Sequence, residues 1–165
     1  SKLKEMGVQN CIDYNVEDVY NKVMEFTGNR GVDLIIDPVG GENWKISYKC
    51  LSKMGKLIIY GDQNFVKGKT FSFITTMKEV FSMPKYRPMD LMSQNKSIMG
   101  YHLGRLAGAE DKIQTAVIAL SQLVQDGKLS PVIDKIFPYS EAPKAHSYIQ
   151  NRKNFGKVLL DFRDQ

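Results

Sequence analysis

Two short apolar runs that each stop in glycine constrain this chain more than any other feature of its sequence. The first run, 32–36, leads into Asp37-Pro38-Val39-Gly40-Gly41, and the second, 56–60, ends at Gly61. Between them, residues 42–54 have the length of one helix. Strands that are apolar throughout are typical of parallel sheets covered on both faces. We therefore predict a strand–helix–strand crossover in a parallel sheet.

The alternation of strand and helix continues on either side of this crossover. The expected elements are, in order, a helix that ends at Gly7, a strand at 10–14, a helix capped by Asn15 and ended by Gly28, the strand 32–37, a helix capped by Asn43 and ended by Gly55, the strand 56–60, a strand at 97–103, a helix at 110–125 stopped by Gly127, a strand at 131–137, a short helix capped by Ser140 with Pro143 in its first turn, and a strand at 157–162. This order predicts an α/β fold. Residues 62–96 interrupt it as a long excursion with one amphipathic helix at 71–81, and such excursions are often lids or oligomer contacts.

Composition and charge exclude several classes of protein. The 165 residues are 42% hydrophobic and 25% charged, which is ordinary for a soluble globular domain. No apolar run approaches the roughly 20 residues that span a bilayer. The net charge of +5 comes from lysines and arginines scattered along the chain. We interpret it as a solvated basic surface rather than a site for nucleic acid or an anionic membrane.

The two cysteines, Cys11 and Cys50, are too few for a disulfide framework or a zinc site. Both lie among apolar residues, and we expect them to behave as small core side chains. A reducing, cytoplasmic setting fits this usage of cysteine.

The strand ends are the candidate ligand site, because ligands of parallel α/β sheets bind outside the carboxyl ends of the strands. Glycine lets a ligand approach the backbone there. Glycine and aromatic residues recur at three strand ends, in 37–41, 60–61 and 100–103, and together predict a platform for a flat ring. His102 is a candidate ligand contact or a satisfied structural histidine, and His146 is expected to be structural. No serine, histidine and carboxylate fall in a pattern that indicates hydrolysis.

The order and spacing of these motifs resemble the medium-chain dehydrogenase/reductase superfamily. Within it, the chain is most similar to the zinc-free quinone oxidoreductase branch and there to the VAT-1 group. The motifs that carry the resemblance are Gly7-Val8, Ile12-Asp13-Tyr14, Gly31-Val32-Asp33, Asp37-Pro38-Val39-Gly40-Gly41, Met54-Gly55-Lys56, Tyr60-Gly61, Gly100-Tyr101-His102-Leu103-Gly104 and Gly156-Lys157-Val158-Leu159-Leu160. Each motif is weak alone, but their order covers essentially the whole chain.

The resemblance implies a partial Rossmann-type doubly wound sheet. Residues 1–128 would be the C-terminal part of a dinucleotide-binding domain, and 129–165 a strand–helix–strand return to a catalytic domain. The glycine-rich phosphate loop, the lysine for the NADPH 2′-phosphate and the catalytic half would precede Ser1. We therefore expect a fragment that binds NADPH weakly or not at all and has no turnover.

The resemblance also assigns candidate cofactor contacts. They are Tyr14 near the adenosine phosphate, Asp37, Val39, Gly40 and Gly41 beside the ribose and pyrophosphate, Tyr60, Gly61, Tyr101, His102 and Leu103 flanking the nicotinamide, and Asn154 as a polar residue that reaches it. The implied reaction is hydride transfer from NADPH to a quinone or an α,β-unsaturated carbonyl, without a metal. A homodimer through the strand 97–103 is also implied.

Two alternatives differ in function. One is a membrane-surface module on a vestigial reductase scaffold, peripheral on vesicles or organelles, with Phe71, Phe73, Phe81 and the lysines at 67, 69 and 78 as its contacts. The other is an acyl-chain enoyl reductase, which shares the cofactor but differs in substrate.

Overall fold

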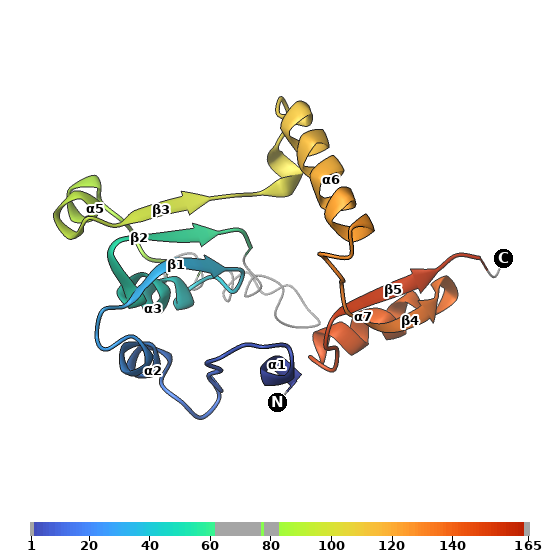
Figure 1. The fold of residues 1–165 in the computed structure, drawn as a ribbon, viewed down its shortest axis with the longest axis horizontal. Coiled ribbons are helices and arrows are strands. Elements are labelled where there is room, and N and C mark those ends of the chain that lie inside the picture. Colours follow the sequence, from blue (N-terminus) through green and yellow to red (C-terminus); the bar gives the residue numbers. More distant parts are fainter. Residues whose placement is uncertain (1, 62–76, 78–82, 164–165) are drawn as a thin grey trace. The chain divides into compact units, whose positions relative to one another are not determined.

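The two apolar runs form neighbouring parallel strands in the computed structural model, which describes residues 2–61, 77 and 83–163 (Figure 1). Strand β1 (Val32–Asp37) pairs with β2 (Leu51–Ile59), and β2 pairs with β3 (Ser97–Gly100). All three strands are parallel. Helix α3 (Asn43–Cys50) connects β1 to β2 and packs on both strands. The predicted crossover and the α/β class are confirmed.

The core of this sheet is centred on β2. Leu57 is fully buried, and Cys50 and Leu51 are almost so. The prediction for Cys50 as a core side chain is therefore confirmed, whereas Cys11 is only half-buried. Burial of Leu57 and its neighbours removes apolar surface from water, which is the main favourable term in folding.

Strand β2 begins earlier than the sequence predicted. Helix α3 ends at Cys50 rather than near Gly55, and the segment up to Gly55 is a β-bulge. Val32 pairs with Leu51, but Leu34 pairs with Lys56, so residues 52–55 of β2 correspond to the single residue Asp33 of β1. Met54 takes a positive φ there, and Gly55 is crowded by the carbonyl oxygens of neighbouring backbone. The glycine thus marks a bulge inside a strand and not the end of a helix.

Residues 2–31, which precede β1, contain two helices and no strand. Helix α1 (Lys2–Glu5) ends two residues before Gly7, the predicted stop, which follows with a φ of +88°. The strand expected at 10–14 is wrong, because no strand pairs with this segment and its last part is a turn in which Asp13 N–H donates to Glu17 at 2.8 Å. Helix α2 (Val19–Phe26) is capped by Asp18 rather than by Asn15. The Asp18 carboxylate accepts from the N–H of the third residue after it.

The chain divides by its contacts into two units, Ser1–Leu106 and Ala107–Gln165. The second unit holds α6 (Glu110–Gln125), β4 (Ile133–Pro138), the short 3₁₀-helix η3 (Tyr139–Glu141), α7 (Ala142–Gln150) and β5 (Lys157–Asp161). Strands β4 and β5 pair in parallel, and α7 packs on both of them. Helix α6 has its predicted bounds, but α7 begins after Glu141 instead of being capped by Ser140. The predicted boundary at 128 concerned family domains and stays a prediction.

The excursion expected between β2 and β3 is described only from 83 onward, apart from 77. There the structure adds helix α5 (Pro88–Gln94), which the sequence did not predict, with proline at its first position. The amphipathic helix expected at 71–81 lies outside the described residues. All the aromatic and basic residues named for the membrane-surface alternative also lie outside the described residues.

Candidate functional site

A cavity of about 720 Å³ lies at the carboxyl ends of β2 and β3. Its lining is Trp44, Ile59, Tyr60, Gly61, Gly100, Tyr101, His102, Leu103 and Gly104. We call it the strand-end cavity. Its volume is within the roughly 300–1,000 Å³ of small-molecule sites. Its place is the one where parallel α/β sheets bind ligands.

The backbone holds the cavity walls in register with the sheet. The Tyr60 N–H donates to the Asp37 carbonyl at 3.3 Å, and the Tyr101 N–H donates to the Ile59 carbonyl at 2.8 Å. These bonds extend the parallel ladders one residue past each strand. A short 3₁₀-helix, η2 (Leu103–Arg105), then turns the chain, with Arg105 N–H donating to the His102 carbonyl at 3.0 Å. The predicted strand 97–103 therefore ends at Gly100, and the rest of it becomes the cavity wall.

Aromatic rings and glycines make up most of the cavity lining. Tyr60 and Tyr101 remain 49% and 43% exposed, so their rings are available to a ligand. A Cβ on Gly61 would lie 3.1 Å from the Pro38 carbonyl oxygen, which is tighter than ordinary contact. The close packing of the first strand end on the second thus favours glycine at this position. Rings beside bare backbone suit a flat, partly polar ligand.

Asp37 organises the turn that follows β1. Its side chain is 2% exposed and accepts hydrogen bonds from the Val39 N–H at 2.8 Å, the Asn43 amide at 2.8 Å and the Ser47 hydroxyl at 2.6 Å. These donors come from the turn and from two positions of α3. A buried carboxyl group with three donors fixes the start of the helix against the strand. Asn43, expected as the helix cap, is the first helical residue and binds Asp37 instead.

The structure brings five of the predicted contacts together at the strand-end cavity: Tyr60, Gly61, Tyr101, His102 and Leu103. The remaining six lie elsewhere: Asp37, Val39, Gly40 and Gly41 in the turn after β1, Tyr14 in the irregular segment before α2, and Asn154 in the second unit. Gly40 and Gly41 are buried with φ of +88° and +60°. The side-chain amide of Asn154 donates to the Gly156 carbonyl at 3.0 Å.

Trp44 is the lining side chain that sequence reasoning missed. It lies in the first turn of α3, directly after the glycine turn, and this position at the end of β1 was the available signal. Its carbonyl accepts from the Tyr86 hydroxyl at 3.1 Å, while its indole Nε1 is buried and has no hydrogen-bond partner among the described residues. Trp44 is also the single tryptophan of the sequence.

Tyr86 and Tyr48 support α3 behind the cavity wall. Their ring centroids are 5.0 Å apart, and burial raises the pKa of Tyr86 to about 12. The Lys96 ammonium donates to the Tyr48 carbonyl at 2.9 Å and lies 4.8 Å from the Tyr48 ring. Burial lowers the pKa of Lys96. The segment that leads into β3 is thus tied to α3 by two side chains.

The part of the chain that the structure describes offers no metal centre and no membrane span. No group of three or more His, Cys, Asp or Glu side chains is placed there to hold a metal ion. Within the same residues, every helix is too short or too polar to cross a bilayer.

A parallel α/β sheet with a ring-lined cavity at its strand ends is the arrangement of the Rossmann-like nucleotide-binding domains. The family model described as zinc-binding dehydrogenase matches residues 6–160. The chain therefore belongs to the zinc-binding dehydrogenase family of the medium-chain dehydrogenase/reductases, which confirms the resemblance drawn from the sequence.

Individual relatives agree with this assignment. The chain is 32% identical over 158 residues to the human synaptic vesicle membrane protein VAT-1 homolog, covering 96% of this chain and 40% of the relative. The structure of the human VAT-1 homolog-like protein matches 99% of this chain and 42% of its own, with a TM-score of 0.71 and 23% identity. A 2-haloacrylate reductase matches 96% of this chain and 45% of its own, with a TM-score of 0.69 and 26% identity. The chain thus spans well under half the length of these proteins.

Proposed function

We propose that this chain supplies the nicotinamide side of an NADPH-dependent oxidoreductase that reduces a quinone or an α,β-unsaturated carbonyl without a metal. The observation that carries the proposal is the strand-end cavity, with exposed tyrosine rings and bare glycine backbone at the carboxyl ends of β2 and β3. The family to which the chain belongs supports an oxidoreductase, which is the coarser part of this proposal. The 2-haloacrylate reductase among its relatives is, by its name, a reductase of an α,β-unsaturated acid.

The residues of the cavity fit a nicotinamide ring. The cofactor, when bound, supplies the hydride. Tyr60 and Tyr101 provide aromatic surface for a flat ring, and Gly61 leaves the backbone accessible beside them. The polar backbone between Tyr101 and Leu103 is the group that would hold a carboxamide. These residues orient the ring and keep water from it, and orientation is a large part of catalysis by such sites.

The turn after β1 has a supporting role in the proposal. Gly40 and Gly41 adopt left-handed backbone conformations, so a side chain at either would be strained. Asp37 holds this turn through its three hydrogen bonds. We propose that the turn presents backbone to the ribose and pyrophosphate and that Tyr14 lies near the adenosine phosphate, while the contact of Asn154 with the nicotinamide stays a prediction.

Trp44 makes cofactor binding directly measurable. Because it is the single tryptophan and lines the cavity, its emission should fall when a nicotinamide ring enters, with energy transfer to NADPH. The titration uses this chain and a version preceded by the N-terminal part of the human relative, since the chain spans 40% of that protein. We expect weak binding or none by the chain, tight binding by the extended version, and a preference for NADPH over NADH.

Two variants of the extended version separate a specific site from non-specific quenching. Gly61→Val should abolish the signal, because a Cβ already lies within 3.1 Å of the Pro38 carbonyl and a branched side chain would also intrude on the ring site. Ser97→Val is the control, since Ser97 is an exposed strand position outside the cavity lining and a strand accommodates a β-branched side chain. Failure of both NADPH and NADH to quench the folded extended version would overturn the proposal. Oxidation of NADPH by a quinone, compared with an enone, then decides the substrate class.

We propose a homodimer through the edge of β3 that pairs with no strand among the described residues. This strand is last in the order β1-β2-β3, and Met99 on it is 56% exposed. An open strand edge pairs readily with a second copy. A Met99→Lys variant should shift the mass measured by light scattering from dimer to monomer, whereas an unchanged mass would place the contact elsewhere.

The membrane-surface alternative has its support in the names of the relatives, which are vesicle membrane proteins. It is compatible with a cytoplasmic protein that associates peripherally with vesicles or organelles. Cosedimentation with anionic liposomes tests it, and charge reversal at the lysines 67, 69 and 78 should abolish the binding. Binding to liposomes together with no NADPH binding by the extended version would favour this alternative over the reductase.

A further inference from the structure

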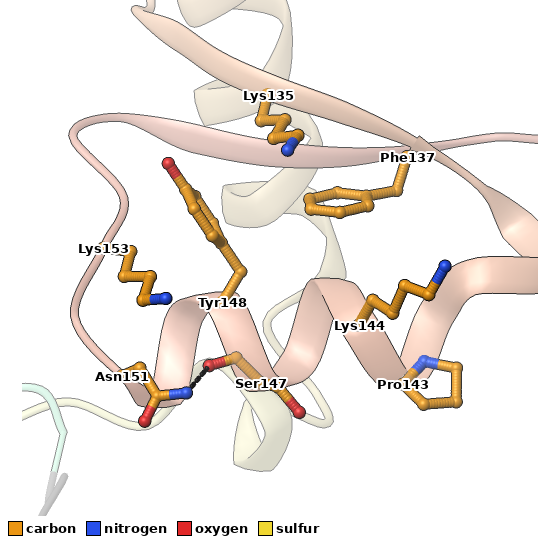
Figure 2. Close-up of a pocket in the computed structure, with 8 residues that line it drawn as sticks. All are labelled: Lys135, Phe137, Pro143, Lys144, Ser147, Tyr148, Asn151 and Lys153. Carbon is orange, nitrogen blue, oxygen red and sulfur yellow. Dashed lines mark hydrogen bonds between the residues drawn. The ribbon is translucent and has the colours of Figure 1, made fainter.

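A second pocket, of about 400 Å³, lies in the second unit between β4 and α7 (Figure 2). Its lining is Lys135, Phe137, Pro143, Lys144, Ser147, Tyr148, Asn151 and Lys153. We call it the lysine pocket. It shares no residue with the strand-end cavity, and the proposed reductase function makes no use of it.

Three ammonium groups from separate elements surround this pocket. Lys135 comes from β4, Lys144 from the first turns of α7, and Lys153 from the segment that follows the helix. The lining contains no carboxylate. Two acids lie just outside the lining: Glu141 pairs with Lys144, and Asp134 acts on Tyr148. Like charges gathered in this way repel one another until an anion enters.

The Lys135 ammonium is held in place by aromatic rings and not by an acid. It lies 4.8 Å from the Phe137 ring centroid and 5.5 Å from that of Tyr148. The two rings are themselves 5.9 Å apart and tilted by 60°. Figure 2 shows the lysine side chain lying between them. Cation–π contact orients the charge but leaves its hydrogen bonds unused, so the ammonium can still donate to a ligand.

The remaining surface of the pocket is apolar or neutral. Phe137 is 7% exposed, and with Pro143 and Tyr148 it forms an apolar wall. The Asn151 amide donates to the Ser147 carbonyl at 2.8 Å, which closes the helix end on that side (Figure 2). The neighbouring Asp134 carboxylate raises the pKa of the Tyr148 hydroxyl.

We propose that the lysine pocket binds a phosphate monoester. Lysine binds phosphate as a point charge, and the dianion of a monoester balances several ammonium groups at once. The pocket is larger than an inorganic anion needs, and its apolar wall accommodates the organic part of the ester. The same group occurs on small metabolites and on the headgroup of phosphatidic acid, so the ligand is either free or part of a lipid surface.

The test is an NMR titration of the whole chain with phenyl phosphate as the probe. Amide signals of Phe137, Ser147 and Tyr148 should shift together and saturate at millimolar concentrations. Phenyl sulfate, which has the same shape and one charge less, should bind several-fold more weakly. Vesicles of phosphatidylcholine with phosphatidic acid form the second arm, and pure phosphatidylcholine is their control. Binding only to the acidic vesicles would identify a lipid ligand, and binding to phenyl phosphate in solution a free one.

Variants decide whether the lysine pocket is responsible. Lys135→Gln with Lys153→Gln should weaken binding of phenyl phosphate about tenfold or more, because two charge-assisted bonds are lost. Lys112→Gln with Lys157→Gln removes the same charge from the same unit outside the pocket and should leave affinity within about twofold. Lys153→Gln alone is the second variant. Lys153 lies beyond α7 and makes no ring contact among the described residues, so weaker binding by this variant cannot come from lost packing on Phe137 and Tyr148.

Three results would overturn the proposal. They are equal weakening by the pocket variants and the control pair, equal binding of phenyl phosphate and phenyl sulfate, and an absence of saturable shifts in the pocket together with no binding to the acidic vesicles.

Discussion

The two units contain the same strand–helix–strand arrangement, but the two arrangements differ at the carboxyl ends of their strands. In the first, α3 connects the parallel strands β1 and β2, and in the second, α7 connects the parallel strands β4 and β5. Each arrangement has a glycine before one strand, Gly31 before β1 and Gly156 before β5, packed on the backbone at the start of the neighbouring strand. The amino ends of the two arrangements are therefore alike.

The carboxyl ends differ. Strand β1 ends in Asp37, which is buried and accepts three hydrogen bonds from the turn and the helix. Strand β5 ends in Asp161, which pairs with Arg163 at the surface. The first arrangement thus shapes the turn beside a cavity at the strand ends, whereas the second places its pocket along the side of its helix. Equal topology does not fix where a ligand binds; the residues after each strand do.

The largest expected effect tests the likeness of the two amino ends. Alanine at Gly31 would place Cβ 2.6 Å from the Cys50 carbonyl oxygen, and alanine at Gly156 would place it 2.5 Å from that of Val132. Both glycines also have positive φ, so each substitution adds backbone strain to the clash. We expect each to lower the free energy of unfolding by about 4 kcal/mol, measured by urea denaturation.

Gly28 and Gly127 are the matched controls for these substitutions. They have φ of +58° and +69°, but nothing lies within 4 Å of a Cβ at either position. Alanine there should cost only the backbone term of about 1 kcal/mol. If Gly31→Ala or Gly156→Ala costs no more than its control, close packing of the strand starts is not what requires glycine.

The next effect tests the difference between the two carboxyl ends. Asp37→Ala leaves the donors of Val39, Asn43 and Ser47 without their acceptor, and we expect a loss of about 3 kcal/mol in the free energy of unfolding. Asp161→Ala removes an exposed ion pair and should leave the melting temperature nearly unchanged. Similar losses for the two variants would show that the strand ends are not energetically distinct.

The smallest effect separates two tyrosines, one in each unit, by pH. Burial raises the pKa of Tyr86 to about 12, and the neighbouring Asp134 carboxylate raises that of Tyr148. For Tyr86 the stability is fully present below the unfolded pKa of about 10 and is lost as the pH rises through about 12, since only the unfolded chain gives up the proton in that window. Tyr86→Phe should remove the last ionisation seen at 295 nm, and Tyr148→Phe should not. A last ionisation that survives Tyr86→Phe would contradict the assignment.

Local pattern was sufficient for much of the fold. The apolar run of β1 and the helical spacing of α6 predicted Val32–Asp37 and Glu110–Gln125 with the bounds observed, because each signal lies within the element itself. The strand expected at 10–14 failed for the opposite reason, since a strand depends on a partner that its own sequence does not specify. The sequence predicts a helix end at Gly55, but a bulge also uses a positive φ, here at Met54, followed by glycine.

The candidate site was predictable where it follows the strand ends. Tyr60, Gly61 and the segment Tyr101–Leu103 line one cavity because neighbouring parallel strands bring their carboxyl ends to one edge. Trp44 was missed because it enters the cavity from the helix and not from a strand end. Asp37 was expected as a ligand contact, and its hydrogen bonds are to the protein itself; sequence does not tell which acceptor a buried carboxyl group serves.

The order of the strands along the chain has a consequence for how the first unit folds and opens. Strands β1 and β2 are separated by about 20 residues at their paired positions, but β2 and β3 by about 40. Because the loop that must close is longer for β3 and the strand lies at the edge of the described sheet, we expect β3 to join the sheet last. We expect its amide hydrogens to exchange first. Since β3 carries one wall of the strand-end cavity, a ligand held there should slow hydrogen exchange most in the strand that arrives last.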